Sequence, residues 1–301
     1  MSERYPHVRR YSDGPEPSLL IRESVGITFY MRRPHQEVAQ QVLRSVEVYL
    51  HVVGPQMLRW YCNPYTTDWD ELDDKGWEYN RREMLQALAT SLSLSERPDA
   101  TTGYEIDYEG HMLDKDEADA AGMVSFFLPT EYLEEHGPGR VRELALELAA
   151  GLPFNSGHAG LAMLYPDGLL GTTEAIREPC LRYPGLHISA VQSTSWSIGT
   201  RLNGVHWLNF LGQPVLGEVG GTEGLRARLH SPGTTVQELD EGRALVTLGT
   251  WPEAGDLEQG QTLPAYRELA RVLEPWQYRH KARWGGFSAE DMRRWERRFL
   301  D

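Results

Sequence analysis

Two hydrophobic spacings alternate along this chain. Over residues 19–31, apolar side chains alternate with small or polar ones, which is the period of a half-buried strand. Over residues 38–53, apolar positions recur at steps of three and four, which predicts a helix with one buried face. A strand followed by a helix is predicted again at residues 123–128 and 131–151, with a Pro-Gly pair breaking the first part of that helix.

Shorter patterns occupy much of the remaining chain. Residues 80–94 carry leucines at helical spacing, and residues 172–180 predict another helix. Residues 104–109 alternate strictly, which predicts a strand with Tyr or Ile on one face and three carboxylates on the other. An apolar run at residues 158–165 predicts a further strand. Near the C-terminus, residues 288–299 begin with a capping-box sequence and continue as an amphipathic helix.

The stretch from Gly204 to Trp276 is the most regular part of the chain. It predicts a strand anchored by Trp207, a glycine-rich turn, a short helix, a buried strand that stops at Trp251, and a terminal amphipathic helix. These elements form a unit that can pack well, but they contain no catalytic motif.

The elements together predict an α+β fold, in which mixed or antiparallel sheets are flanked by amphipathic helices. We expect an irregular arm over residues 1–17, a domain over residues 18–276 and a basic helical extension over residues 277–301. The domain could consist of two related α/β halves, residues 18–120 and 121–276, although no residue-level repeat supports duplication.

The net charge of −14 is concentrated in two windows. Residues 68–78 hold six carboxylates and one lysine, and residues 105–119 hold seven carboxylates and one lysine. A strand over 104–109 would order part of this charge into a row with about 7 Å between successive acids. Such a field repels nucleic acid and anionic membranes and attracts basic partners, whereas the simpler interpretation is a solvated face that maintains solubility.

Motifs for cofactors, metals and catalysis are incomplete. The acidic run at 114–119 departs from a calcium loop at three positions, and the glycine-rich stretches lack the residues of a phosphate-binding loop. The ten histidines show no zinc-type spacing, so neither a metal nor a cofactor is expected. Ser156 and His158 lack a nucleophile elbow. Two distant cysteines and the absence of a long apolar stretch favour a cytoplasmic protein.

A family resemblance rests on the stretch described above. The segments GVHWLNFLGQPVLGEVGG and LVTLGTWPEAGDLEQGQTLPAYRELARVLEPW resemble the C-terminal half of the type VI secretion immunity family, and the resemblance extends over residues 18–276. It implies a protein without enzymatic activity that binds a cognate antibacterial effector and blocks its active site or substrate path. Some relatives are paired with nucleases, whose basic groove an acidic surface would fit.

The leading hypothesis is therefore an immunity protein for a toxin, with a basic nuclease as partner and with no binding of nucleic acid or membrane. The matching motif residues resemble fold determinants, so the contact candidates come from charge alone. They are Asp68, Asp70, Glu71, Asp73, Asp74, Glu105, Asp107, Glu109, Asp114 and Asp116. The alternatives are a hydrolase that uses His158 or an acid pair, and an accessory or scaffold subunit of the secretion apparatus.

Overall fold

The computed structural model describes residues 5–13, 15–113, 119–166, 171–240, 242–281 and 283–301. The strands are β1 (Arg10–Tyr11), β2 (Leu19–Met31), β3 (Trp60–Cys62), β4 (Trp69–Glu71), β5 (Thr90–Ser95), β6 (Glu105–Gly110), β7 (Gly122–Pro129), β8 (Ser156–Leu164), β9 (His187–Ile188), β10 (Leu208–Leu211), β11 (Thr234–Asp240) and β12 (Arg243–Leu248). The α-helices are α1 (His35–Val53), α2 (Asp74–Gln86), α3 (Thr130–Ala149), α4 (Thr172–Arg182), α5 (Val191–Ser195), α6 (Val215–Glu218), α7 (Gly221–Arg226), α8 (Pro264–Leu273) and α9 (Ala289–Glu296). Short 3-10 turns lie at Pro55–Met57, Leu257–Gln259 and Glu274–Trp276.

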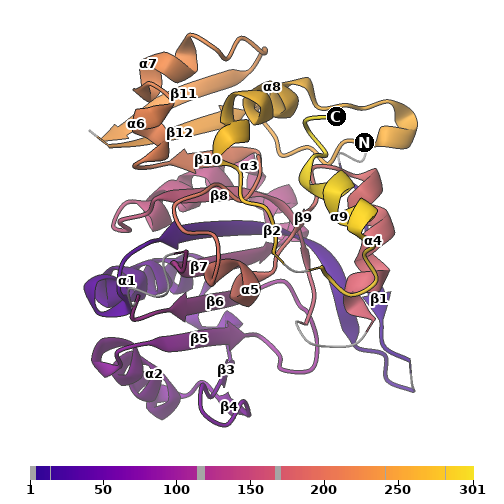
Figure 1. The fold of residues 1–301 in the computed structure, drawn as a ribbon. Helices are drawn as coiled ribbons and strands as arrows, with labels where there is room; N and C mark the ends of the chain where they lie inside the picture. The colour runs from indigo at the N-terminus through magenta and orange to yellow at the C-terminus, as the bar shows by residue number, and fades with distance from the viewer. Residues whose placement is uncertain (1–4, 14, 114–118, 167–170, 241, 282) are drawn as a thin grey trace.

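The described strands form one 12-stranded sheet that confirms the predicted α+β class. Its order is β11-β12-β10-β8-β2-β7-β6-β5-β3-β4, with β1 beside β2 and β9 beside β8. All the pairings are antiparallel except the parallel pair of β8 and β9. The two ends of the sheet, β11 and β4, lie at opposite ends of the molecule (Figure 1).

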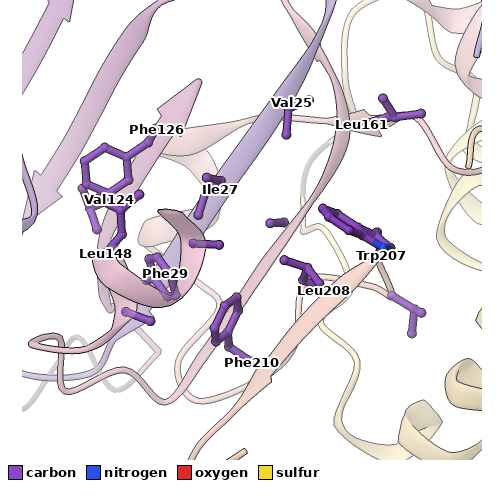
Figure 2. Packing of buried hydrophobic residues seen from close by; sticks show 14 of the residues in the cluster. Val25, Ile27, Phe29, Val124, Phe126, Leu148, Leu161, Trp207, Leu208 and Phe210 are labelled. Atoms are coloured by element: carbon purple, nitrogen blue, oxygen red, sulfur yellow. The ribbon is translucent and has the colours of Figure 1, made fainter. Parts of the chain in front are cut away.

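The main core lies on the face of the sheet that α1 and α3 cover. Val25, Ile27 and Phe29 of β2 point into it together with Phe126 of β7 and Leu148 of α3 (Figure 2). Each of these side chains is completely buried, and burial of one such side chain contributes about 1.5–3 kcal/mol. Because β2 pairs with β7 on one side and β8 on the other, this core fixes the centre of the sheet.

The opposite face of the central strands is more polar. Thr28 of β2 lies between Ser125 of β7 and His158 of β8, and its hydroxyl is 2.9 Å from the hydroxyl of Ser125. The short helix α5 packs against β6 and β7. This face carries the groups from which the candidate sites are built.

The predicted helix over residues 80–94 is wrong in its bounds. The helix begins earlier because the Asp73 carboxylate accepts hydrogen bonds from the backbone N–H groups of Lys75 and Gly76, at 3.0 and 2.8 Å. It ends at Gln86, and residues 90–95 form β5 between β3 and β6. Leu92 is therefore buried from a strand, whereas Leu88 is 59% exposed.

Several other predicted features agree with the structure. The break in α3 falls at Gly137, whose positive φ of 77° suits glycine. The capping box at Ser288 begins α9, and Trp295 and Met292 of that helix are buried.

Strand β11 was not predicted, because its residues are mostly polar, lie on an exposed edge and show little hydrophobic periodicity. In the part of the chain that the structure describes, no helix is long and apolar enough to cross a membrane.

Candidate functional site

Strand β6 arranges three carboxylates in a row. Ile106 and Tyr108 are buried on the core face, so Glu105, Asp107 and Glu109 point to the opposite face, as the alternation predicts. Each of the three is partly buried rather than fully solvated. The second acidic window thus contributes an ordered row fixed by a paired strand.

A cleft of about 660 Å³ lies against this row. Its lining includes the three β6 carboxylates, Asp99 from the loop before β6, and Trp69 of β4. Phe127, Met163 and Leu164 give part of the wall an apolar character. The cleft therefore combines negative charge with apolar surface, which suits a long basic side chain with an aliphatic stem.

The carboxyl group of Glu105 is affected both by burial and by the neighbouring Asp107. Burial raises the pKa of Glu105 well above its ordinary value, and the charge and hydrogen bond of Asp107 raise it further. The hydroxyl of Ser93 on β5 donates to Oδ1 of Asp107 at 2.8 Å, which fixes the position of that carboxylate. A proton is therefore retained on Glu105 to higher pH than usual, and a cation that enters the cleft would favour its release.

The β3–β4 hairpin places part of the first acidic window on the same sheet face. Glu71 pairs with Trp60, Trp60 with Ser95, and Ser95 with Glu105, and directly opposed residues share a face. Three strand spacings separate Glu71 from Glu105, a distance of about 14 Å. We refer to Glu71, Glu105, Asp107 and Glu109 as the acidic face.

The remaining predicted contact residues have other positions. Asp68 is exposed on the hairpin beside Trp69, whereas Asp70 points to the other face, where Tyr61 lies. Burial raises the pKa of Tyr61, and the charge and hydrogen bond of Asp70 raise it further. Asp73 caps α2 and Asp74 is its first residue, so Asp73 has a structural role. The predicted contacts Asp114 and Asp116 and most of the calcium-like run lie outside the described residues.

Two exposed apolar side chains lie near the end of β6 and were missed in the sequence. The ring of Trp196, just after α5, is 4.1 Å from the ring of His111, which directly follows β6. Trp196 is 52% exposed and Met112 is 51% exposed. A lone tryptophan in a polar stretch gives no periodic signal, and its position beside β6 depends on the tertiary fold.

Three buried histidines form a second cluster. His158 of β8, His187 of β9 and His206 before β10 offer ring nitrogens that lie within 4.8 Å of one another. The rings of His158 and His206 stack with centroids 3.8 Å apart. Burial lowers the pKa of all three, to about 3 for His206, and the charge of Arg298 acts in the same direction on each. The charge of His206 lowers the pKa of His158 and His187 further. Local spacing could not indicate this group, because three separate segments supply it.

The C-terminal segment contributes one of the charges beside that cluster. Arg298, which lies in the predicted basic extension, donates to the carbonyl oxygens of Pro184 and Trp295 at 2.9 Å each. Its guanidinium lies over the Trp295 ring, 4.1 Å from the centroid, and burial lowers its pKa to about 10. This arginine is therefore partly buried and held in place by the carbonyl oxygens around it.

A family model described as type VI immunity for VRR-NUC matches residues 41–299. The chain belongs to this immunity family. The membership confirms the resemblance inferred from the 204–276 stretch, and the matched region continues through α9. The immunity family includes antitoxins of type VI secretion, so that part of the functional prediction is confirmed.

The fold of this immunity-family chain is also similar to a solved structure. A type VI secretion system protein of Pseudomonas aeruginosa superposes with a TM-score of 0.77 and 20% sequence identity, covering 97% of this chain and 87% of that one. At this identity the likeness concerns the fold. No curated protein matches the sequence.

Proposed function

We propose that this protein neutralises a cognate VRR-NUC nuclease effector by binding it through the acidic face. The observation that carries the proposal is the ordered carboxylate row on β6 beside a cleft, in a member of a family named for immunity to such nucleases. A nuclease needs a basic groove for the phosphate backbone, and a negative surface competes for that groove. Occupation of the groove would exclude DNA without any chemistry by the inhibitor.

The composition of this surface supports a protein partner. Tight interfaces combine a buried aromatic or apolar anchor with a charged rim. Trp196 and Met112 lie near the end of the row that carries Glu109, while Asp68 and Glu71 extend the charge to the edge of the sheet. We propose that the exposed tryptophan is the anchor and that the carboxylates accelerate and orient association.

The geometry around Ser156 does not favour the hydrolase alternative. Its hydroxyl donates to the carbonyl oxygen of Arg201 at 2.8 Å, and His158 is buried and stacked on His206. A nucleophile and its general base should be within hydrogen-bond reach of each other and accessible to substrate. We therefore propose a non-enzymatic inhibitor that acts in the cytoplasm, where an incoming nuclease meets DNA.

The test is binding and protection by a charge-reversed protein. Asp68→Lys/Glu71→Lys changes two exposed residues of the hairpin without touching the α2 cap. The matched control, Glu178→Lys/Glu238→Lys, makes the same change of charge on α4 and on the distant edge strand β11. Each variant is co-expressed with the cognate VRR-NUC effector, survival is scored, and association rates are measured at low and high salt.

The hairpin variant is expected to associate on the order of tenfold more slowly at low salt, with the difference shrinking as salt rises. The control variant should associate nearly as fast as the unmodified protein. Equal effects of the two variants would mean that net charge, and not the acidic face, controls binding. Co-purification with secretion machinery in cells lacking the effector would instead favour the scaffold alternative.

A further inference from the structure

The cluster of His158, His187 and His206 has the composition of a transition-metal site. The three side chains are 5%, 4% and 3% exposed, respectively. They are presented by two paired strands and by the turn before a third, so the backbone that holds them is rigid. Trp207, the neighbour of His206, belongs to the main core with Leu161 and Leu208 (Figure 2), and this fixes the turn.

The hydrogen bonds around His206 determine which nitrogen can bind a metal. Its Nε2 is 2.8 Å from the carbonyl oxygen of Asn203, which can only accept, so Nε2 carries the proton. The lone pair of the neutral ring is then on Nδ1. The backbone N–H of His206 donates to Oδ1 of Asn209 at 2.9 Å, which orients the residue further. In histidines that ligate metals, the ring nitrogen that does not bind the ion typically donates a hydrogen bond, as Nε2 of His206 does to Asn203.

His187 supplies an independent indication of a ligand. Its Nδ1 is buried and has no hydrogen-bond partner, while its Nε2 lies 3.5 Å from the side-chain amide of Asn203. A buried polar atom without a partner carries a desolvation cost of about 1–3 kcal/mol. The side-chain nitrogen of Asn203, which also donates to the Tyr30 hydroxyl at 2.8 Å, can only donate, so in this arrangement Nδ1 of His187 carries the ring proton. A metal ion at Nδ1 would remove the desolvation cost once the proton has moved to Nε2. That change requires the Asn203 amide to turn, so that its oxygen accepts from Nε2 and from the Tyr30 hydroxyl.

We propose that His158, His187 and His206 bind one divalent transition-metal ion, with Zn²⁺ as the best match. Three neutral imidazoles suit zinc, which takes nitrogen ligands at about 2.0–2.1 Å in tetrahedral geometry. Burial keeps all three rings neutral at physiological pH, so no proton must be displaced before binding. The fourth ligand would be water or another small donor, because three histidines leave one position open.

Binding requires a small contraction of the cluster. Tetrahedral ligands at these bond lengths lie about 3.3 Å apart, whereas the histidine nitrogens lie within 4.8 Å of one another. The stacked rings of His158 and His206 must also tilt, since both lone pairs have to point at one centre. The positive charge of Arg298 opposes the ion and lowers its affinity. The site is therefore expected to be one that fills reversibly and that a chelator can strip.

The experiment uses the full chain with any affinity tag removed. Metal content per chain is measured by mass spectrometry after expression with added zinc, and the protein is then stripped with a chelator and titrated with Co²⁺. We expect about one zinc per chain and the intense visible absorption of tetrahedral Co²⁺, reversed by Zn²⁺. The thermal midpoint should rise with added Zn²⁺ in proportion to the logarithm of its concentration.

Variants assign the ligands. His187→Gln should weaken Co²⁺ binding by more than about 100-fold, and Asn203→Ala, which removes an outer partner, by about 10–100-fold. His35→Gln is the matched control, because His35 is equally buried but its two nitrogens are engaged by Tyr108 and Met84 at 2.7 and 2.9 Å. Absence of both the cobalt absorption and the zinc-dependent thermal shift in the stripped unmodified protein would overturn the proposal. Neither measurement involves the effector, so this outcome is separate from any failure of the proposed inhibition.

Discussion

Replacement of Glu105 by glutamine should stabilise the uncomplexed protein at neutral pH. Glu105 and Asp107 are two residues apart on β6, so their side chains leave the strand about 7 Å apart. With an effective dielectric constant of about 20, two full negative charges at that distance repel by about 2 kcal/mol. Glutamine keeps the shape and the hydrogen-bonding capacity of the side chain but removes this repulsion.

The pH dependence follows from the direction of the Glu105 pKa shift. The pKa of Glu105 is raised above its ordinary value of 4.5 by burial and by Asp107, so the folded state binds a proton that the unfolded state releases. The stability that this group supports is therefore present below about pH 4.5 and declines as pH rises toward the folded pKa. The glutamine variant should match the unmodified protein at acid pH and exceed it by about 1–2 kcal/mol at pH above the folded pKa.

Urea unfolding at a series of pH values measures this difference directly. The free energy of unfolding is extrapolated to water for both proteins, and the exposed Glu178→Gln serves as a control that should change little. A gain that is equally large at acid pH would show that repulsion between the two carboxylates is not its cause. The absence of any gain at high pH would show that Glu105 is not destabilised in the folded state.

Three further predictions concern the proposed interface and the fold. Trp196→Ala should weaken effector binding by about 2 kcal/mol or more in a titration. The loss of stability should be small, because the side chain is 52% exposed in the unbound protein. Unchanged affinity would show that Trp196 is not an anchor. Phe29→Ala should lower the free energy of unfolding by about 3–5 kcal/mol in urea, because it empties a completely buried position, and a loss below about 1 kcal/mol would contradict the packing. Asp73→Ala should cost about 0.5–2 kcal/mol by removing the α2 cap, and serine at this position should recover most of that loss.

Local patterns in the sequence were sufficient for much of the sheet. Strand β6 was predicted with its faces correctly assigned, because strict alternation has only one interpretation when one side is apolar. The helix before it was misplaced because Leu92 continues a helical spacing by coincidence, whereas the cap at Asp73 and the pairing of β5 decide the actual bounds. Patterns that extend over one element were therefore informative, and patterns that cross an element boundary were not.

The groups that require the order of strands could not be predicted. Glu71 and Glu105 share a face only because β3 and β5 lie between their strands. His187 meets His158 because β9 pairs with β8, and the short β9 has no pattern of its own. Sheet order depends on tertiary packing over the whole chain, and the local patterns of a single sequence do not predict it.

Because the β3–β4 hairpin lies at the edge of the sheet, its carboxylates also protect the protein against self-association. Strand β4 is the last in the sheet and presents an unpaired edge to solvent among the described strands. Exposed edges invite pairing with a second chain, and short, charged edge strands prevent it by repulsion. With only three residues, two of them the exposed acids Asp70 and Glu71, β4 has both protective features. Substitutions that neutralise this hairpin therefore carry a risk of aggregation that is separate from any effect on the partner.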